Sequence, residues 1–200
     1  MSDAPKPKRG RPSTLDIDKT LDVAMGAYWQ NDPVDVSLNA ICDLASVSKP
    51  ALYRIFGGED GLMRAVLDRY AEQVLSDIFK ILARDAPVNE TLAALIHFAS
   101  QEPKMATGCV FYKMRAGKHR LGPKTRERVA EIDTAAVQAF EAYLVARSDD
   151  GDWDGDQSPA MVARYLVEQI GLALTQRAAG EDPAGIRDTL ALALSVIQRP

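Results

Sequence analysis

Two short apolar helical segments separated by only three residues constrain this chain more than any other feature. Over residues 38–45 the apolar side chains recur at intervals of three and four, which predicts a helix with one buried face. Residues 49–56 continue the same pattern, and Ser37 and Ser48 stand where N-cap residues belong. Two helices joined so closely form either a helix-turn-helix, whose second helix can enter the major groove of DNA, or an ordinary corner between packed helices.

The second of these helices carries polar and small side chains away from its apolar face. Its start tolerates a proline at position 50, because the first N–H groups of a helix have no hydrogen-bond partner within the helix. Gly57-Gly58 ends the helix. We expect it to bury Leu52, Ile55 and Phe56. The side chains left off that face are Lys49, Ala51, Tyr53 and Arg54. Because such side chains suit contact with phosphates and base edges, the pattern favours a helix-turn-helix.

Residues 47–62, with the sequence VSKPALYRIFGGEDGL, resemble the motif of the TetR family of bacterial transcriptional regulators. The resemblance extends N-terminally through Gly10-Arg11-Pro12 and a helix that carries Ala24 and Trp29, and it is specific over about residues 9–70. It implies an all-α protein of about nine helices, in which a three-helix helix-turn-helix head precedes a larger C-terminal helical domain for effector binding and dimerisation.

The resemblance also implies three segments with different tasks. They are a flexible basic arm over residues 1–13, a DNA-binding domain over 14–58, and a ligand-binding and dimerisation domain over 59–200. The arm holds three prolines and four basic residues without an apolar period, which is typical of a segment that is disordered alone. It is either a solubilising tail or an arm that orders on DNA, along or in the minor groove.

The function that the resemblance implies is that of a sequence-specific DNA-binding transcriptional regulator, most simply a repressor released from a palindromic operator by a small-molecule effector. We expect no enzymatic activity and no cofactor. The residues expected to contact double-stranded operator DNA are Lys8, Arg9, Arg11, Ser37, Ser48, Lys49, Pro50, Ala51, Tyr53 and Arg54.

Two positions depart from the family pattern. The family often has a lysine that contacts a phosphate just after the glycine turn, where this chain has Glu59. A carboxylate suits a helix N-terminus but repels DNA. Position 55 is often histidine or another polar residue, and Ile55 cannot donate a hydrogen bond. We therefore expect DNA binding to depend more on the remaining contacts and on the arm.

Helices are expected along the rest of the chain. Residues 59–83 keep apolar side chains four apart, and such a helix, about 37 Å long, would link the head to a second domain. Further helices are expected over residues 16–31, 88–101, 109–117, 123–147, 158–179 and 182–197. The last two form a hairpin that closes its own core or pairs with its copy across a two-fold axis, and the family resemblance favours a homodimer.

An unidentified small-molecule effector is expected to bind among the middle helices. The candidate lining residues are aromatic or sulfur-containing side chains, although each is individually typical of a core position. They are Phe79, Phe98, Phe111, Tyr112, Met114, Phe140 and Tyr165.

Composition excludes several classes of protein. The net charge is −4, and residues 1–58 hold seven basic and seven acidic residues, which argues against an indiscriminate polyanion binder. No apolar run is long enough to cross a membrane and no signal segment is apparent, so we expect a cytoplasmic protein without membrane partners. Two cysteines and two histidines, far apart in sequence, do not predict a disulfide framework or a metal site.

Two charged segments leave alternatives open. Lys113–Arg128 holds seven basic residues, which form a solvated face, an anionic effector site or a surface that attracts DNA. The acidic segment 148–158 lacks the final glutamate of a calcium-binding EF-hand loop, which favours a solvated loop.

The rivals to a DNA-binding regulator are a small helical enzyme and a helical adaptor. An enzyme would need titratable groups that converge in a pocket. Cys109 and His119 are the nearest candidates, but no acidic residue is evident to orient the histidine, and we expect Cys109 to be a small core residue. His97, beside an apolar stripe, is expected to be a packed core histidine or an interfacial one.

Overall fold

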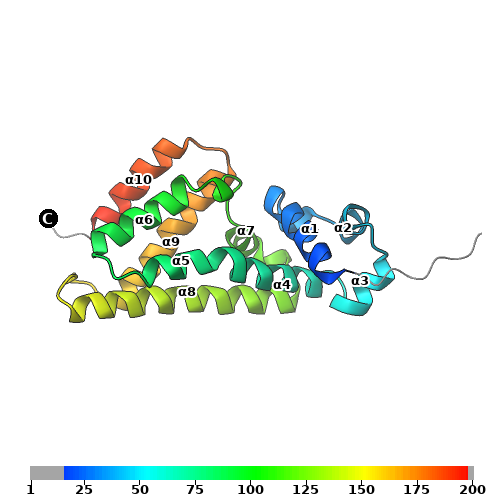
Figure 1. Ribbon diagram of the computed structural model, residues 1–200, viewed down its shortest axis with the longest axis horizontal. Helices are drawn as coiled ribbons and strands as arrows, with labels where there is room; N and C mark the ends of the chain where they lie inside the picture. The colour runs from blue at the N-terminus through cyan, green and yellow to red at the C-terminus, as the bar shows by residue number, and fades with distance from the viewer. Residues whose placement is uncertain (1–15, 198–200) are drawn as a thin grey trace, which may run out of the picture.

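The structure, a computed structural model, describes residues 16–197, and all regular elements in that range are helical. Three helices, α1 (Ile17–Gln30), α2 (Leu38–Ala45) and α3 (Lys49–Phe56), form a compact unit at one end (Figure 1). We call this unit the head. The remaining helices form a larger bundle, which we call the body. The predicted arm, with Lys8, Arg9 and Arg11, lies outside the described residues.

Each helix of the head begins at a residue that caps it locally. The carboxylate of Asp16 accepts a hydrogen bond from Lys19 N at 3.0 Å at the start of α1. The hydroxyls of Ser37 and Ser48 do the same for α2 and α3, accepting from Ala40 N at 3.2 Å and from Ala51 N at 3.4 Å. The two N-caps predicted for the helix pair are therefore confirmed.

The head is held together by large side chains that are fully buried, among them Tyr28, Ile41 and Leu52. Ile55, which was predicted to be buried, is instead 38% exposed, and Ile17 at the start of α1 is 45% exposed. Ile17 is the first residue of α1, where the chain has only begun to meet the core. Ile55 lies about 60° round α3 from Leu52, because successive residues turn by about 100°, and this short helix buries only a narrow stripe.

A continuous helical segment connects the head to the body. It consists of α4 (Glu59–Tyr70), a π-helical turn (Ala71–Leu75) and α5 (Ser76–Leu82). It agrees with the single long helix predicted over residues 59–83, except for the π turn, which inserts about one extra residue into the helical repeat. Figure 1 shows the segment running from beside α3 along the length of the body.

The body is a bundle built around two long helices, α8 (Pro123–Asp149) and α9 (Pro159–Ala178), which pack side by side. The elements around them are α6 (Val88–Ser100), α7 (Val110–Ala116), α10 (Pro183–Ser195) and the 3-10 turns Pro103–Met105 and Lys118–Arg120. With α4 to α5 taken as one, residues 16–197 contain nine α-helices, as predicted. In that range, no helix is long and apolar enough to cross a bilayer.

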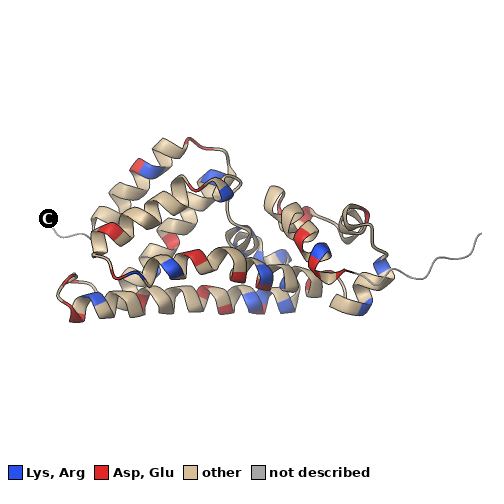
Figure 2. Cartoon of the chain, viewed as in Figure 1, with Lys and Arg blue, Asp and Glu red and all other residues tan. Residues whose placement is uncertain are grey.

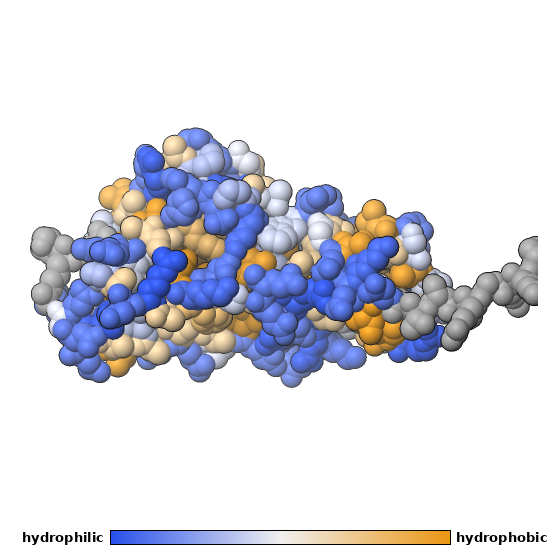
Figure 3. Space-filling view, in the orientation of Figure 1, coloured by the Kyte–Doolittle hydropathy of each residue, from blue (hydrophilic) through white to orange (hydrophobic). Residues whose placement is uncertain are grey.

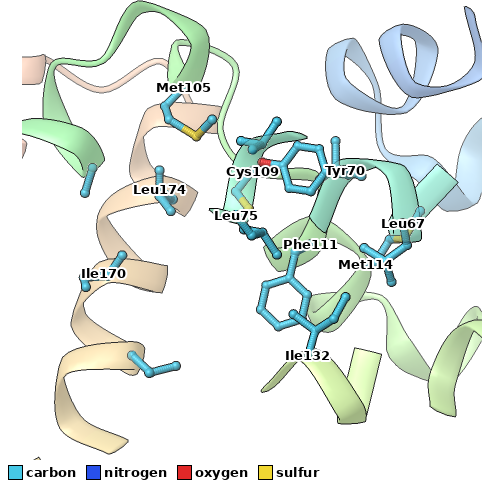
Figure 4. Close-up of a cluster of buried hydrophobic side chains, with 14 of the residues drawn as sticks. Leu67, Tyr70, Leu75, Met105, Cys109, Phe111, Met114, Ile132, Ile170 and Leu174 are labelled. Carbon is cyan, nitrogen blue, oxygen red and sulfur yellow. The ribbon is translucent and has the colours of Figure 1, made fainter. Parts of the chain in front are cut away.

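The core of the body forms where α7 inserts between the linking helical segment and the long helices. Figure 4 shows Tyr70 and Leu75 facing Phe111 and Met114 of α7, with Ile132 of α8 beneath. All five side chains are buried. The linking segment therefore contributes its apolar face to the same core that α7, α8 and α9 share.

Two helices of the body are capped from a distance. The residue before α8 is Gly122 and the residue before α6 is Pro87, and neither has a side chain that can cap. The carboxylate of Asp60 in α4 accepts hydrogen bonds from the backbone at the start of α8, and that of Asp152 accepts from Val88 N of α6 at 2.8 Å. The predicted solvated loop 148–158 is thus partly built into the fold, and its Trp153 is buried.

Candidate nucleic-acid interface and ligand cavity

Helix α3 begins at the outer end of the head and runs back toward the start of α4 (Figure 1). Lys49, Pro50 and Arg54 are exposed, Tyr53 is 50% exposed and Ala51 is half-buried. The structure therefore brings together on one short helix the side chains that the sequence singled out. On the side of the molecule drawn in Figure 3, hydrophobic surface lies beside polar surface over the part of the head where α2 and α3 lie.

The two N-cap serines, Ser37 and Ser48, are also exposed. Each hydroxyl oxygen accepts a backbone N–H, which leaves the hydroxyl hydrogen available for an acceptor outside the protein. A helix N-terminus also attracts negative charge through its unpaired N–H groups. The starts of α2 and α3 are thus suited to phosphate oxygens.

The turn after α3 fixes the position of the Tyr53 ring. Gly57 and Gly58 both have positive φ, +76° and +119°, a conformation that favours glycine. A Cβ on Gly58 would lie 3.3 Å from the Tyr53 ring, so the ring packs directly over this turn. The aromatic side chain therefore packs against the turn on one side while about half of its surface stays exposed.

The basic stretch Lys113–Arg128 lies at the junction of head and body. Lys113 Nζ donates to the carbonyl of Trp29 at 2.5 Å, and the guanidinium of Arg120 pairs with Asp35 at 2.6 Å. Trp29 Nε1 in turn donates to Gly108 O at 2.8 Å. Burial lowers the pKa of the Lys113 ammonium. A simple solvated face does not describe this stretch, because two of its cations, Lys113 and Arg120, join the two parts of the molecule.

The Asp60 carboxylate ties the start of α4, which directly follows the head, to the start of α8. It accepts from Lys124 N and Thr125 N, each at 3.0 Å, and from the Thr125 hydroxyl at 2.7 Å. Burial opposes ionisation of Asp60, but these hydrogen bonds and the charge of Lys124 outweigh it and lower the pKa of the carboxyl. A Cβ on Gly122 would lie 2.3 Å from Asp60 Cγ, so only glycine fits beside this carboxylate.

A cavity of about 140 Å³ lies in the body between the linking helical segment and α7, α8 and α9. Of the residues predicted to line a ligand pocket, Phe79, Phe111, Tyr112 and Phe140 line it. The others lie elsewhere. Met114 is in the core, Phe98 lies beneath the Lys104 ammonium, and Tyr165 donates through its hydroxyl to Ala193 O of α10 at 2.8 Å.

The wall of this cavity has few polar groups, and these already have partners. The Tyr112 hydroxyl donates to Val167 O at 2.8 Å, and burial raises its pKa well above the ordinary value. The Arg128 guanidinium bonds Asp68 at 2.5 Å and Glu131 at 3.0 Å. The remaining lining residues are apolar, and sequence reasoning missed those that are aliphatic: Ala71, Leu75, Ile78, Leu82, Ile132, Ala135, Ala136, Val167 and Ile170.

Other candidate groups from the sequence lie apart from both sites. Cys109 is buried, and burial raises the pKa of its thiol, which is the environment of a core residue rather than of a nucleophile. His97 is exposed on α6, so it is not the packed core histidine that was one of its two expected roles, and its place at an interface stays a prediction. Within residues 16–197, no three His, Cys, Asp or Glu side chains are grouped to hold a metal ion.

Several solved structures with the same arrangement of helices are described as TetR-family transcriptional regulators. A cysteine mutant of the TetR family transcriptional regulator CifR, in complex with 26-base-pair double-strand operator DNA, superposes with a TM-score of 0.75 and 20% identity, over 94% of this chain and 100% of that one. This chain has the TetR fold. Reduced NemR of Escherichia coli matches with a TM-score of 0.80 and 16% identity, over 92% of this chain and 98% of that one.

Sequence comparison gives a more local match. The HTH-type transcriptional repressor ComR of Escherichia coli (strain K12) is 41% identical over 68 residues, which are 34% of this chain and 32% of that protein. The match thus spans about a third of this relative's length. No family model matches the chain. The predicted all-α TetR fold, with a helix-turn-helix head and a larger helical body, is confirmed.

Proposed function

We propose that this protein is a sequence-specific DNA-binding transcriptional regulator, a repressor that a small-molecule effector releases from a palindromic operator. The observation that carries the proposal is the exposed face of α3, which presents Lys49, Tyr53 and Arg54 from a helix-turn-helix. The operator-bound CifR structure and the repressor ComR are the relatives that support it. In this proposal residues 14–58 bind DNA and residues 59–200 bind the effector and dimerise.

The contacts divide by chemistry. Ser37, Ser48 and Tyr53 offer hydroxyl hydrogens to phosphates, and Lys49 and Arg54 reach base edges or phosphates. The small side chains at Pro50 and Ala51 let α3 approach the bases closely. Lys8, Arg9 and Arg11, which lie outside the described residues, complete the contacts as an arm along the minor groove.

We propose that the protein acts as a homodimer through α9 and α10. The two helices pack against each other, and large apolar side chains remain exposed on them, Leu172 to 55%, Leu192 to 72% and Val196 to 71%. Pairing with a second copy would bury this surface in a four-helix bundle. Two heads related by a two-fold axis would read half-sites about 34–36 Å apart.

The cavity indicates which effector chemistry to test. Because its polar groups already have partners inside the protein, a charged ligand would lose its hydration without gaining a counter-ion. A volume of about 140 Å³ is close to that of apolar protein cavities that take up a single benzene ring. We therefore propose a neutral, apolar effector of about one ring in size.

The linking helical segment provides a route from the cavity to the head. Ala71 and Leu75 of its π turn line the cavity, and Asp60 at its other end holds the start of α8. A ligand that prefers one arrangement of this segment lowers operator affinity only by its differential affinity for the two arrangements. The π turn is the point at which the segment can change its hydrogen bonding most readily.

An enzyme is the less favoured proposal. Catalysis would require titratable groups that converge on a substrate, and the cavity of the body is apolar. A helical adaptor without DNA affinity is the second rival, because Glu59 and Ile55 weaken the case for tight DNA contact. Binding measurements separate the adaptor from the regulator.

The test is fluorescence anisotropy of the full chain on DNA from immediately upstream of its own gene, with a scrambled duplex as the control. We expect preference for the upstream DNA, with affinity that falls steeply as salt rises. Lys49→Ala and Tyr53→Phe should weaken binding without lowering the melting temperature. Absence of binding to any duplex at low salt would overturn the regulator and leave the adaptor.

The effector proposal has its own measurement. Benzene or toluene, added to saturation, should raise the melting temperature of the wild type but not that of Ala136→Phe, which fills the cavity. If one of these compounds binds and also lowers operator affinity, the release mechanism gains support. If the two proteins respond alike, the cavity is not the site.

A further inference from the structure

Lys124, in the first turn of α8, lies against the end of the proposed DNA-reading helix. Its Nζ is 3.8 Å from the point that a Cβ on Gly57 would occupy, and Gly57 is the residue at which α3 ends. Lys124 is exposed. Figure 2 shows Lys and Arg residues gathered where α4 and α8 begin, next to the head. A cation of the body thus stands beside the head.

The backbone of Lys124 is fixed relative to the head. Its N–H donates to Asp60 at 3.0 Å, and Thr125 N and its hydroxyl donate to the same carboxylate. Asp60 follows α3 by only a few residues, so the start of α8 moves with the turn after α3. Only the side chain of Lys124 remains free to adjust, and it is long enough to reach beyond the protein surface.

The end of α3 carries negative charge in need of compensation. The helix C-terminus has a partial negative charge, and the exposed Glu59 and the Asp60 carboxylate follow directly. An eight-residue helix is about 12 Å long, comparable with the width of the major groove, so both ends of a helix laid across the groove approach phosphates. Arg54 in the last turn of α3 supplies one cation near this end, and Lys124 would supply a second beside the turn that follows.

We propose that Lys124 binds a backbone phosphate beside the C-terminal end of α3, so that the DNA interface extends from the head onto the body. This inference rests on the proposed function. It gives α8 two roles, because the same helix carries Lys124 at its start and lines the cavity with Ile132 and Ala136 further on. A shift of α8 caused by a ligand would then reach the DNA interface at Lys124 and, through Asp60, at the turn after α3.

The test compares the salt dependence of DNA binding by the wild type, Lys124→Gln and Lys80→Gln. Lys80 is an exposed lysine in α5, and its substitution makes the same change of net charge within the body. The probe is a duplex that the wild type selects from a random pool, measured by anisotropy between 50 and 300 mM salt, roughly the range over which phosphate contacts are resolved.

We expect Lys124→Gln to reduce the slope of log affinity against log salt by about 0.9 per subunit, which corresponds to roughly an eightfold loss of affinity per subunit at 0.1 M salt. Lys80→Gln should leave the slope unchanged, and Lys124→Arg should restore it. If the wild type binds its duplex and Lys124→Gln keeps the wild-type slope, Lys124 only neutralises the end of α3 and the inference is overturned. If the wild type selects no duplex, the proposed function fails as well.

Discussion

The head and the body of this molecule begin their helices in different ways. In the head, Asp16, Ser37 and Ser48 each cap the helix that follows them. In the body, α9 and α10 have such local caps, but α6 and α8 depend on the carboxylates of Asp152 and Asp60, which are 64 residues from the N–H groups of Val88 and Lys124 that they bond. A local cap forms with its own helix, whereas a distant cap requires the tertiary fold.

The difference teaches where the two parts of the molecule are joined. A helix that takes its cap from elsewhere is tied to the segment that supplies it. Through Asp60, the start of α8 is tied to the start of α4 and hence to the head. The most sensitive positions for testing communication between the parts are therefore at this cap.

Asp60→Ala, which removes the distant cap of α8, is expected to lower the free energy of unfolding more than any other substitution considered below. It removes the acceptor of two backbone N–H groups and of the Thr125 hydroxyl, and hydrogen bonds to a charged group contribute about 1.5–3 kcal/mol. We expect the free energy of unfolding in urea to fall by about 2–3 kcal/mol.

A second substitution can turn the distant cap into a local one. Gly122 has φ −68° and ψ 166°, the extended conformation of an N-cap, so Gly122→Ser should recover about 1 kcal/mol in an Asp60→Gly background. Glycine is needed at position 60 because the Asp60 Cβ would lie 2.7 Å from the new Cβ. Gly122→Ser alone should destabilise the protein, because its Cβ would meet Asp60. Equal stability of the position-60 variant and the double variant would show that the distance in sequence between a cap and its helix does not distinguish the two kinds of cap.

Asp152→Asn and Ser48→Ala form a matched pair with a smaller effect. Asp152→Asn weakens the distant cap of α6, and Ser48→Ala removes the local cap of α3. Each substitution should lower the free energy of unfolding by about 1 kcal/mol. They should differ in DNA binding, measured by anisotropy, since only Ser48 lies on the proposed interface. Similar losses of DNA affinity in both variants would contradict the assignment of Ser48.

The smallest effect is expected from pH. The pKa of Asp60 is lower in the folded protein than in the unfolded chain, so its contribution to stability is complete above its ordinary pKa and is lost as pH falls through the folded-state value. The stability difference between wild type and Asp60→Asn should therefore be constant near neutral pH and shrink below about pH 4. A difference that grew as the solution became more acidic would contradict this sign.

Sequence reasoning succeeded where the determinants are local. Ser48, Pro50 and Gly57 define α3 through neighbours within a few residues, and the structure confirms its bounds. The helices expected from residues 158 and 182 are likewise found as α9 and α10, and at each start an N-cap residue is followed directly by proline. The exposed surface of α3 followed from the same periodicity, except at Ile55.

Sequence reasoning was weaker where distant segments meet. The caps supplied by Asp60 and Asp152 depend on partners far along the chain, and no local pattern marks them. The π turn at Ala71–Leu75 contains neither proline nor glycine to signal it. The residues that line the cavity were also hard to predict. An aromatic residue at helical spacing indicates a buried face but not the helix against which that face packs. The sequence therefore could not separate Phe140, which lines the cavity, from Tyr165 and Phe98, which do not.

The contact between Asp60 and Gly122 has a consequence for recombining regulators of this fold. If residues 1–58 are exchanged between two such proteins, the boundary falls before position 60. The chain that receives the new head then keeps its own residues at positions 60, 122 and 124, here Asp60, Gly122 and Lys124. A boundary drawn after α4 would instead separate Asp60 from Gly122 and leave α8 uncapped or in steric conflict. Residues 60 and 122 must therefore be inherited together, and they mark the unit of exchange.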